Sequence, residues 1–88
     1  MLILRQYTTD SCAVCKAHKP LLAELEKAYK GELKLEFVNV NTLPIEESQN
    51  ISTVPFYKLF HENGAVVDLW TGTKSKQQIV SVIESALE

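Results

Sequence analysis

The sequence lacks the features that mark secreted and membrane-bound proteins. It has only two cysteines among 88 residues, and they lie three positions apart, which is a poor arrangement for stapling a small secreted domain. No segment approaches the roughly 18–20 consecutive apolar residues of a membrane span, and residues 1–10 lack the basic start and long apolar run of a secretory signal. We therefore expect a cytoplasmic protein that does not bind a membrane.

An excess of basic residues is also lacking. Nine lysines and arginines against eleven aspartates and glutamates give a formal net charge of −2, and the lysines alternate with glutamates instead of forming a basic stripe. This pattern argues against nucleic acid as a partner. The contents of 45% apolar and 23% charged residues are those of a globular protein. The length predicts one domain over residues 1–88, which we expect to be a monomer.

Hydrophobic periodicity predicts alternating strands and helices. Strands are expected near residues 2–7, 33–40, 56–61 and 65–71, with Asn63-Gly64 as the hairpin signal between the last two. Helical spacing is found from residue 12 to about 31 and from about 74 onward, and Pro44 opens a short helix over 44–50. The order β-α-β-α-β-β-α predicts an α/β fold with a four-stranded mixed sheet flanked by helices on both faces. We expect strand 33–40 to be buried on both sides.

Cys12 and Cys15 form a Cys-x-x-Cys motif at the predicted junction between the first strand and the first helix. The free N–H groups of a helix's first turn favour a thiolate there and lower the pKa of a thiol from its ordinary value of about 8.5. Cys12 is therefore the expected nucleophile. Cys15, one turn deeper, is expected to attack the mixed disulfide that Cys12 forms with a substrate.

Two structural interpretations compete with this redox interpretation. The cysteines could be buried packing residues, or Cys12, Cys15 and His18 could be zinc ligands in a Cys-x-x-Cys-x-x-His series. A structural zinc normally has four ligands, and the sequence has no second compact pair of ligands. We therefore expect no metal, and we interpret His18 and His61 as solvent-exposed residues.

Val54-Pro55 is the second informative motif. A proline that follows a loop and opens a strand is a position where a cis peptide bond is tolerated, and an ordinary trans bond is the alternative. The spacing alone does not decide between them. Trp70, on the last predicted strand, is interpreted as a packing residue with no further role.

Several motifs in the same order resemble the thioredoxin family over nearly the whole chain. Residues 15–20 are similar to its C-K-x-x-x-P segment, residues 51–55 to its cis-proline approach, residues 60–64 to its F-x-x-N-G hairpin and residues 72–76 to its G-x-x-S-K helix start. The resemblance implies a thioredoxin-like fold and a dithiol that reduces protein disulfides. It also implies thioredoxin reductase as the electron donor and no cofactor beyond the dithiol itself.

The resemblance also suggests a substrate-binding segment at Thr53, Val54, Pro55 and Gly72. It implies that the Val54-Pro55 bond is cis and faces the dithiol. The backbone of Val54 would then be free to pair with an extended segment of the substrate.

The chain departs from the thioredoxin pattern around its active site. Ser11 stands in place of the usual tryptophan before the first cysteine, and Ala13-Val14 stands in place of Gly-Pro. Gln6 and Phe37 occupy two positions that usually hold a buried aspartate and a nearby lysine, and we expect them to be close in space. The loss of both charges together avoids a buried charge without a partner.

Two alternatives to a thioredoxin-like reductase remain. The strand predicted before the dithiol starts almost at Met1, so we expect a shorter core that resembles that of glutaredoxins, and a glutathione-dependent reductase is the first alternative. Residues 72–75 lack the Gly-Gly turn and acidic residue with which glutaredoxins hold glutathione. A non-catalytic binding module is the second alternative, because fold alone does not fix function.

Overall fold

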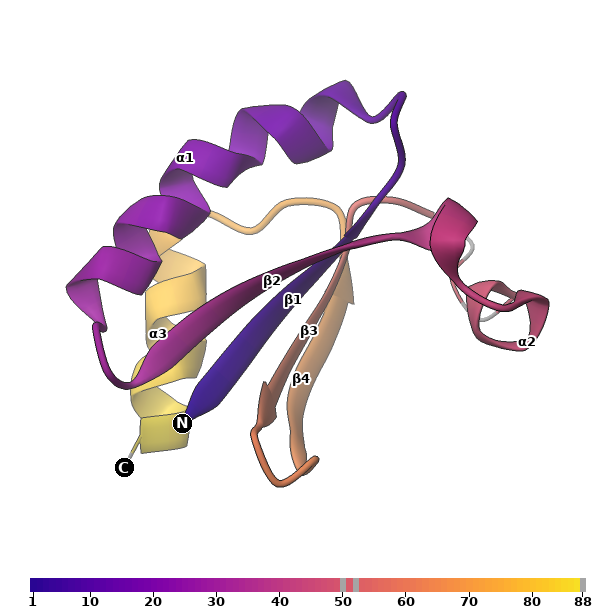
Figure 1. Cartoon of the computed structure of the whole chain (residues 1–88). Helices are drawn as coiled ribbons and strands as arrows, with labels where there is room; N and C mark the ends of the chain where they lie inside the picture. The colour runs from indigo at the N-terminus through magenta and orange to yellow at the C-terminus, as the bar shows by residue number, and fades with distance from the viewer. Residues whose placement is uncertain (50, 52, 88) are drawn as a thin grey trace.

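The computed structural model describes residues 1–49, 51 and 53–87. In chain order its elements are β1 (Leu2–Thr8), α1 (Ala13–Ala28), β2 (Leu33–Asn39), the 3-10 helix η1 (Val40–Thr42), α2 (Ile45–Ser48), β3 (Phe56–His61), β4 (Val66–Thr71) and α3 (Lys76–Leu87) (Figure 1). The predicted order is confirmed. The short helix predicted over 44–50 is shorter in the structure, where it is α2. The last residue of the predicted range, Asn50, lies outside the described residues. No helix in the described part of the chain is long and apolar enough to cross a membrane.

The strands form one mixed sheet in the order β2-β1-β3-β4. β1 pairs in parallel with β2, while the β1–β3 and β3–β4 pairs are antiparallel. The parallel pair follows from the long helix between its strands, and the hairpin follows from Gly64, whose φ of 98° suits a tight turn. The predicted α/β fold with a mixed four-stranded sheet is confirmed. β1 is thus an interior strand, and it leads directly into the loop that carries the first cysteine.

The two longer helices, α1 and α3, both pack on the same face of the sheet (Figure 1). Leu22 and Leu25 of α1 and Ile79 and Ile83 of α3 belong to one buried cluster. The strand residues of this cluster are Leu2, Leu4, Leu33, Tyr57, Leu59 and Trp70. The prediction of helices on both faces is therefore wrong. Helical periodicity shows which side of a helix is apolar, but not which face of the sheet the helix covers.

β2 is also less buried than predicted. Leu33 is its one fully buried residue, whereas Lys34 and Phe37 are exposed. β2 lies at the edge of the sheet, and α1 and α3 cover only one of the sheet's faces. A strand in this position cannot be buried on both sides.

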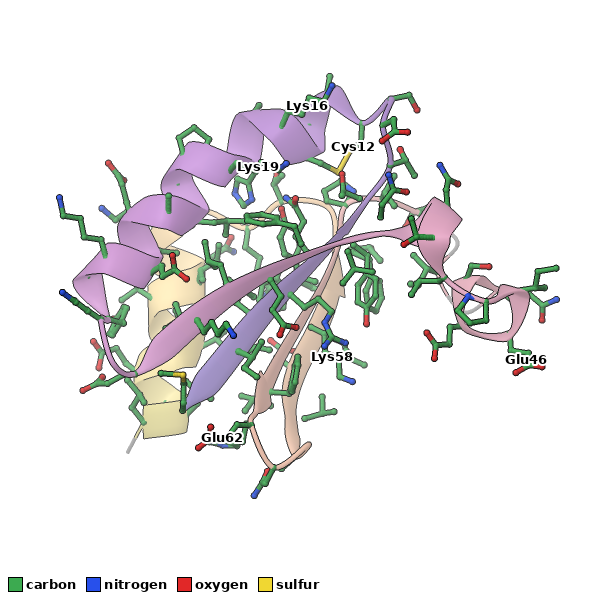
Figure 2. All side chains as sticks on the ribbon, viewed as in Figure 1. Cys12, Lys16, Lys19, Glu46, Lys58 and Glu62 are labelled. Atoms are coloured by element: carbon green, nitrogen blue, oxygen red, sulfur yellow. A yellow bond between two sulfur atoms is a disulfide. The ribbon has the colours of Figure 1, made fainter. Side chains whose placement is uncertain are left out.

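On the face of the sheet opposite α1 and α3, two charged side chains cover the aromatic ring of Phe60. The Arg5 guanidinium and Lys58 Nζ each lie 4.9 Å from the centre of the Phe60 ring, and Phe60 is only 8% exposed. Arg5 also forms an ion pair of 2.8 Å with Glu36 of the neighbouring strand. Figure 2 shows Lys58 on this side of the sheet, away from α1. Alkyl stems and cation–π contacts thus shield Phe60 on the face that α1 and α3 leave uncovered.

We expect Arg5→Ala to lower the free energy of unfolding by about 1–2 kcal/mol, because it removes a partly buried ion pair and a cation–π contact at once. Lys34→Ala, at an exposed position of the neighbouring strand, is the control and should change the stability by less than about 0.5 kcal/mol. Urea denaturation measures both. Equal stabilities of the two variants would show that Phe60 does not depend on the Arg5 side chain.

Candidate active site

The two cysteines lie at the N-terminal end of α1 and form a disulfide bond, with their Cα atoms 5.3 Å apart. Cys12 is the N-cap of α1, and its Sγ accepts a hydrogen bond of 3.1 Å from the backbone N–H of Cys15. The predicted position of the motif at a strand-to-helix junction is confirmed, and so is the expectation that an N–H group of the first turn points at the Cys12 sulfur. In the reduced protein this N–H would favour a negative charge on that sulfur.

The two cysteines differ in their access to solvent. Cys15 is wholly buried, while Cys12 is 9% exposed and Val14 beside it is 53% exposed. Ser11, on the other side of Cys12, is exposed as well. A substrate disulfide can therefore reach Cys12 before Cys15. This difference favours Cys12 as the nucleophile and Cys15 as the resolving residue, an assignment that stays a prediction.

Pro55 immediately precedes β3, at the end of the sheet where β1 finishes. The Val54-Pro55 bond is cis, as the family resemblance implied, and Pro55 is buried. Its carbonyl accepts a hydrogen bond of 2.9 Å from the N–H of Gly72. Phe56, the next residue, pairs with Tyr7 near the end of β1. The structure thus joins Pro55 to Gly72 and sets both at the end of the sheet from which the dithiol loop departs.

A chain of hydrogen bonds runs from the backbone of Cys15, through side chains of β1 and β3, to the side chain of His18 in the next turn of α1. Gln6 is wholly buried, and its Nε2 donates to the Cys15 carbonyl at 3.2 Å and to the Tyr57 hydroxyl at 2.8 Å. The Tyr57 hydroxyl also lies 2.7 Å from Nδ1 of His18. Burial raises the pKa of Tyr57, while the hydrogen bond from Gln6 acts in the opposite direction. The Tyr57 hydroxyl therefore keeps its proton at neutral pH.

His18 is not the solvent-exposed residue that the sequence indicated. It is partly buried, and its ring contacts Tyr57 edge to face with the ring centres 5.6 Å apart. His61, at the end of β3, is partly buried too. The expectation that Trp70 packs in the interior is confirmed, because its ring stacks on Tyr57 with the centres 5.4 Å apart.

Sequence reasoning missed the role of Tyr57 in this network altogether. Its partner His18 lies 39 residues away in the chain, and no local pattern connects two such positions. The one available signal was Gln6, a polar residue on the same side of β1 as the buried apolar residues Leu2 and Leu4. A buried polar side chain needs hydrogen-bond partners, and that requirement could have prompted a search for them.

The zinc interpretation of Cys12, Cys15 and His18 does not fit the structure. The two sulfurs are bonded to each other, and Nδ1 of His18 faces the Tyr57 hydroxyl. Within residues 1–49, 51 and 53–87, no three His, Cys, Asp or Glu side chains are grouped so that they could hold a metal ion.

Gln6 and Phe37 are cross-strand partners, which confirms that they are close, but their surroundings differ. Gln6 is wholly buried, whereas Phe37 is 45% exposed and has Lys19 Nζ 4.9 Å from its ring centre. Phe37 borders a groove of about 320 Å³ lined by Thr8, Thr9, Asp10, Lys16, Lys19, Phe37 and Asn39. Figure 2 shows Cys12, Lys16 and Lys19 along the first half of α1. The groove thus carries two cations and one acid close to the dithiol.

A pair of cysteines that forms a disulfide at the N-terminus of a helix, directly after an interior strand of an α/β sheet, is the site of a thiol–disulfide oxidoreductase. The family model Thioredoxin matches residues 1–85. The chain is 27% identical over 86 residues to a thioredoxin of Rickettsia felis, covering 97% of this chain and 81% of the relative. It is 27% identical over 86 residues to a thioredoxin of Synechocystis sp., covering 97% and 79%. It is 29% identical over 85 residues to thioredoxin C-2 of Corynebacterium nephridii, covering 93% and 76%. The chain belongs to the thioredoxin family.

Proposed function

We propose that this chain reduces disulfide bonds in other proteins and is returned to its dithiol form by a thioredoxin reductase. The observation that carries the proposal is the asymmetry of the dithiol. Cys12 keeps 9% of its surface exposed and has a backbone N–H on its sulfur, whereas Cys15, one helical turn later, is wholly buried. Relatives that bear the name thioredoxin support this choice of electron donor by analogy.

The proposed reaction has two exchange steps. The Cys12 thiolate attacks one sulfur of the substrate disulfide, the S–S bond breaks, and the other substrate sulfur leaves as a thiolate that takes up a proton. Cys15 then loses its proton and attacks Sγ of Cys12, which releases the second substrate sulfur as another thiol. Two electrons have passed to the substrate, and the chain ends as the Cys12–Cys15 disulfide.

We assign substrate contact to Thr53, Val54, Pro55 and Gly72. Thr53 is exposed and Val54 is partly exposed, so an extended substrate segment can approach the backbone before Pro55. Gly72 supports this segment through its hydrogen bond to the Pro55 carbonyl. No cofactor is required, because the two sulfurs carry both electrons. We further propose that residues 1–88 act as a single monomeric domain in the cytoplasm.

Two coupled assays test the electron donor. In the first, NADPH and a thioredoxin reductase supply electrons for the reduction of insulin, and we expect NADPH consumption to depend on the chain. In the second, glutathione and glutathione reductase replace the thioredoxin reductase. We expect that addition of the chain then leaves the rate of NADPH consumption unchanged. Turnover in the second assay alone would establish a glutathione-dependent enzyme. Failure to reduce insulin even with dithiothreitol would instead favour a binding module.

A further inference from the structure

The amide nitrogen of Gln6 is the donor in both of its hydrogen bonds. A carbonyl oxygen carries no proton, so the Cys15 carbonyl accepts from the amide nitrogen of Gln6. The same nitrogen lies 2.8 Å from the Tyr57 hydroxyl oxygen, which accepts its second N–H. In the tautomer of His18 that carries its proton on Nε2, Nδ1 is free to accept the hydroxyl proton of Tyr57 at 2.7 Å. In this tautomer His18 is the final acceptor of a chain of hydrogen bonds that begins at the Cys15 backbone.

This arrangement leaves one acceptor without a donor, on the same amide whose nitrogen contacts the backbone of the resolving cysteine. Oε1 of Gln6 is buried and has no hydrogen-bond partner among the residues that the structure describes. Cys15, whose carbonyl the same amide contacts, is also wholly buried. In the disulfide the Cys15 sulfur has no proton to donate. In the dithiol it carries a proton and becomes a weak donor.

We propose that reduction of the disulfide gives Oε1 of Gln6 its missing partner, the thiol of Cys15, and that Tyr57 and His18 are positioning residues that hold the amide in the required orientation. The proposal rests on thiol–disulfide exchange at Cys12 and Cys15. The new hydrogen bond exists only in the reduced protein, so it shifts the redox equilibrium toward the dithiol. The amide accepts a hydrogen bond from the neutral thiol and takes no proton from it.

His18 acts through the direction of the Tyr57 hydroxyl. As long as Nδ1 of His18 accepts the hydroxyl proton, that proton is turned away from Gln6. Without this acceptor, the hydroxyl would turn toward the Gln6 amide and compete with the Cys15 thiol for Oε1. The ring of Trp70, stacked on Tyr57, holds the phenol in place. The buried Tyr57 hydroxyl stays protonated, because burial raises its pKa.

Equilibration with glutathione tests the effect of the amide. The dithiol and oxidised glutathione are in equilibrium with the protein disulfide and two molecules of reduced glutathione, and alkylation followed by mass spectrometry measures the two protein forms. We expect Gln6→Leu to shift this equilibrium about 3–10-fold toward the disulfide, as the loss of one net hydrogen bond predicts. An unchanged equilibrium in a folded Gln6→Leu protein would overturn the proposal.

The positioning residues are tested in the same equilibrium. We expect Tyr57→Phe and His18→Leu to shift it in the same direction as Gln6→Leu, and His18→Asn to restore it, because a side-chain carbonyl can accept the hydroxyl proton. Tyr29→Phe and His61→Leu are matched controls. The Tyr29 hydroxyl donates to Glu84 at the surface, and His61 lies at the other end of β3, so neither variant should differ from wild type.

A double-mutant cycle and stability measurements exclude a merely structural role. In a Gln6→Leu background, His18→Leu should cause no further shift, because its effect passes through the amide. Gln6→Leu should also lower the folding equilibrium constant of the reduced protein by about 3–10-fold more than that of the oxidised protein. A full effect of His18→Leu in the double variant, or equal losses of stability in both redox states, would contradict the proposal. If Gln6→Leu does not fold, the comparison of His18→Leu with His18→Asn still decides it.

Discussion

Replacement of Cys12 by serine is expected to reduce the rate of disulfide reduction to that of the uncatalysed reaction. A serine hydroxyl is not ionised at neutral pH and cannot form the mixed disulfide with which the exchange begins. The rate is measured as the increase in turbidity when insulin is reduced by dithiothreitol in the presence of the protein. Ser11→Ala changes the exposed residue next to the nucleophile and should keep the wild-type rate, which makes it the matched control.

Replacement of Cys15 by serine should have a different outcome. Cys12 can still attack a substrate disulfide, but nothing then displaces the substrate, so a mixed disulfide through Cys12 accumulates. Mass spectrometry under non-reducing conditions detects this adduct. If the Cys12→Ser protein instead forms a stable adduct through Cys15, the assigned roles of the two cysteines are reversed.

Gln6→Asp is expected to make the stability of the protein strongly dependent on pH. The new carboxyl group would lie at a wholly buried position without a buried lysine beside it, so burial should raise its pKa in the folded state above the unfolded value of about 3.9. Below the unfolded pKa the carboxyl group is neutral in both the folded and the unfolded state, so its ionisation does not lower the free energy of unfolding there. The loss of stability grows as pH rises from there to the folded pKa, and is constant above it. A rise of about 2–3 units would remove roughly 3–4 kcal/mol.

Gln6→Asn is the matched control for this effect, because its side chain has the size of aspartate but no charge. Urea denaturation of both variants between pH 3 and 8 gives the difference in the free energy of unfolding that is due to ionisation alone. A difference that does not change with pH would mean that water reaches position 6. Faster insulin reduction by Gln6→Asp at pH 7 would show that a carboxylate at position 6 assists deprotonation of Cys15. The wild-type protein has a neutral amide at this position and no such carboxylate.

The parts of the site that follow from nearby residues were predictable from the sequence. Cys12 and Cys15 are separated by one helical turn, and the polar loop before them marks where the strand ends and the helix begins, so both the motif and its place at the helix N-terminus could be derived. The parallel pairing of β1 and β2 followed from the length of the helix between them. The cis bond before Pro55 required the family resemblance, because an isolated Val-Pro sequence fits either isomer.

The parts that depend on contacts between distant residues could not be predicted in this way. The hydrogen bond between His18 and Tyr57 forms because β3 lies next to β1 beneath α1, and nothing in the helical pattern of α1 identifies a histidine that has such a partner. The placement of α1 and α3 on one face has the same origin. Each helix has one apolar side, and only the connections of the whole chain determine the face of the sheet against which that side packs.

A single turnover with no other reductant present tests most directly whether the Cys12–Cys15 dithiol reduces protein disulfides. The chain is first reduced with dithiothreitol, freed of it, and mixed with an excess of insulin. Thiols are then alkylated, and peptides are analysed by mass spectrometry. We predict that each chain reduces one insulin disulfide, and that Cys12 and Cys15 are recovered unalkylated, joined in a disulfide. Insulin disulfides that remain intact while both cysteines are recovered in alkylated form would contradict the claim that this dithiol reduces protein disulfides.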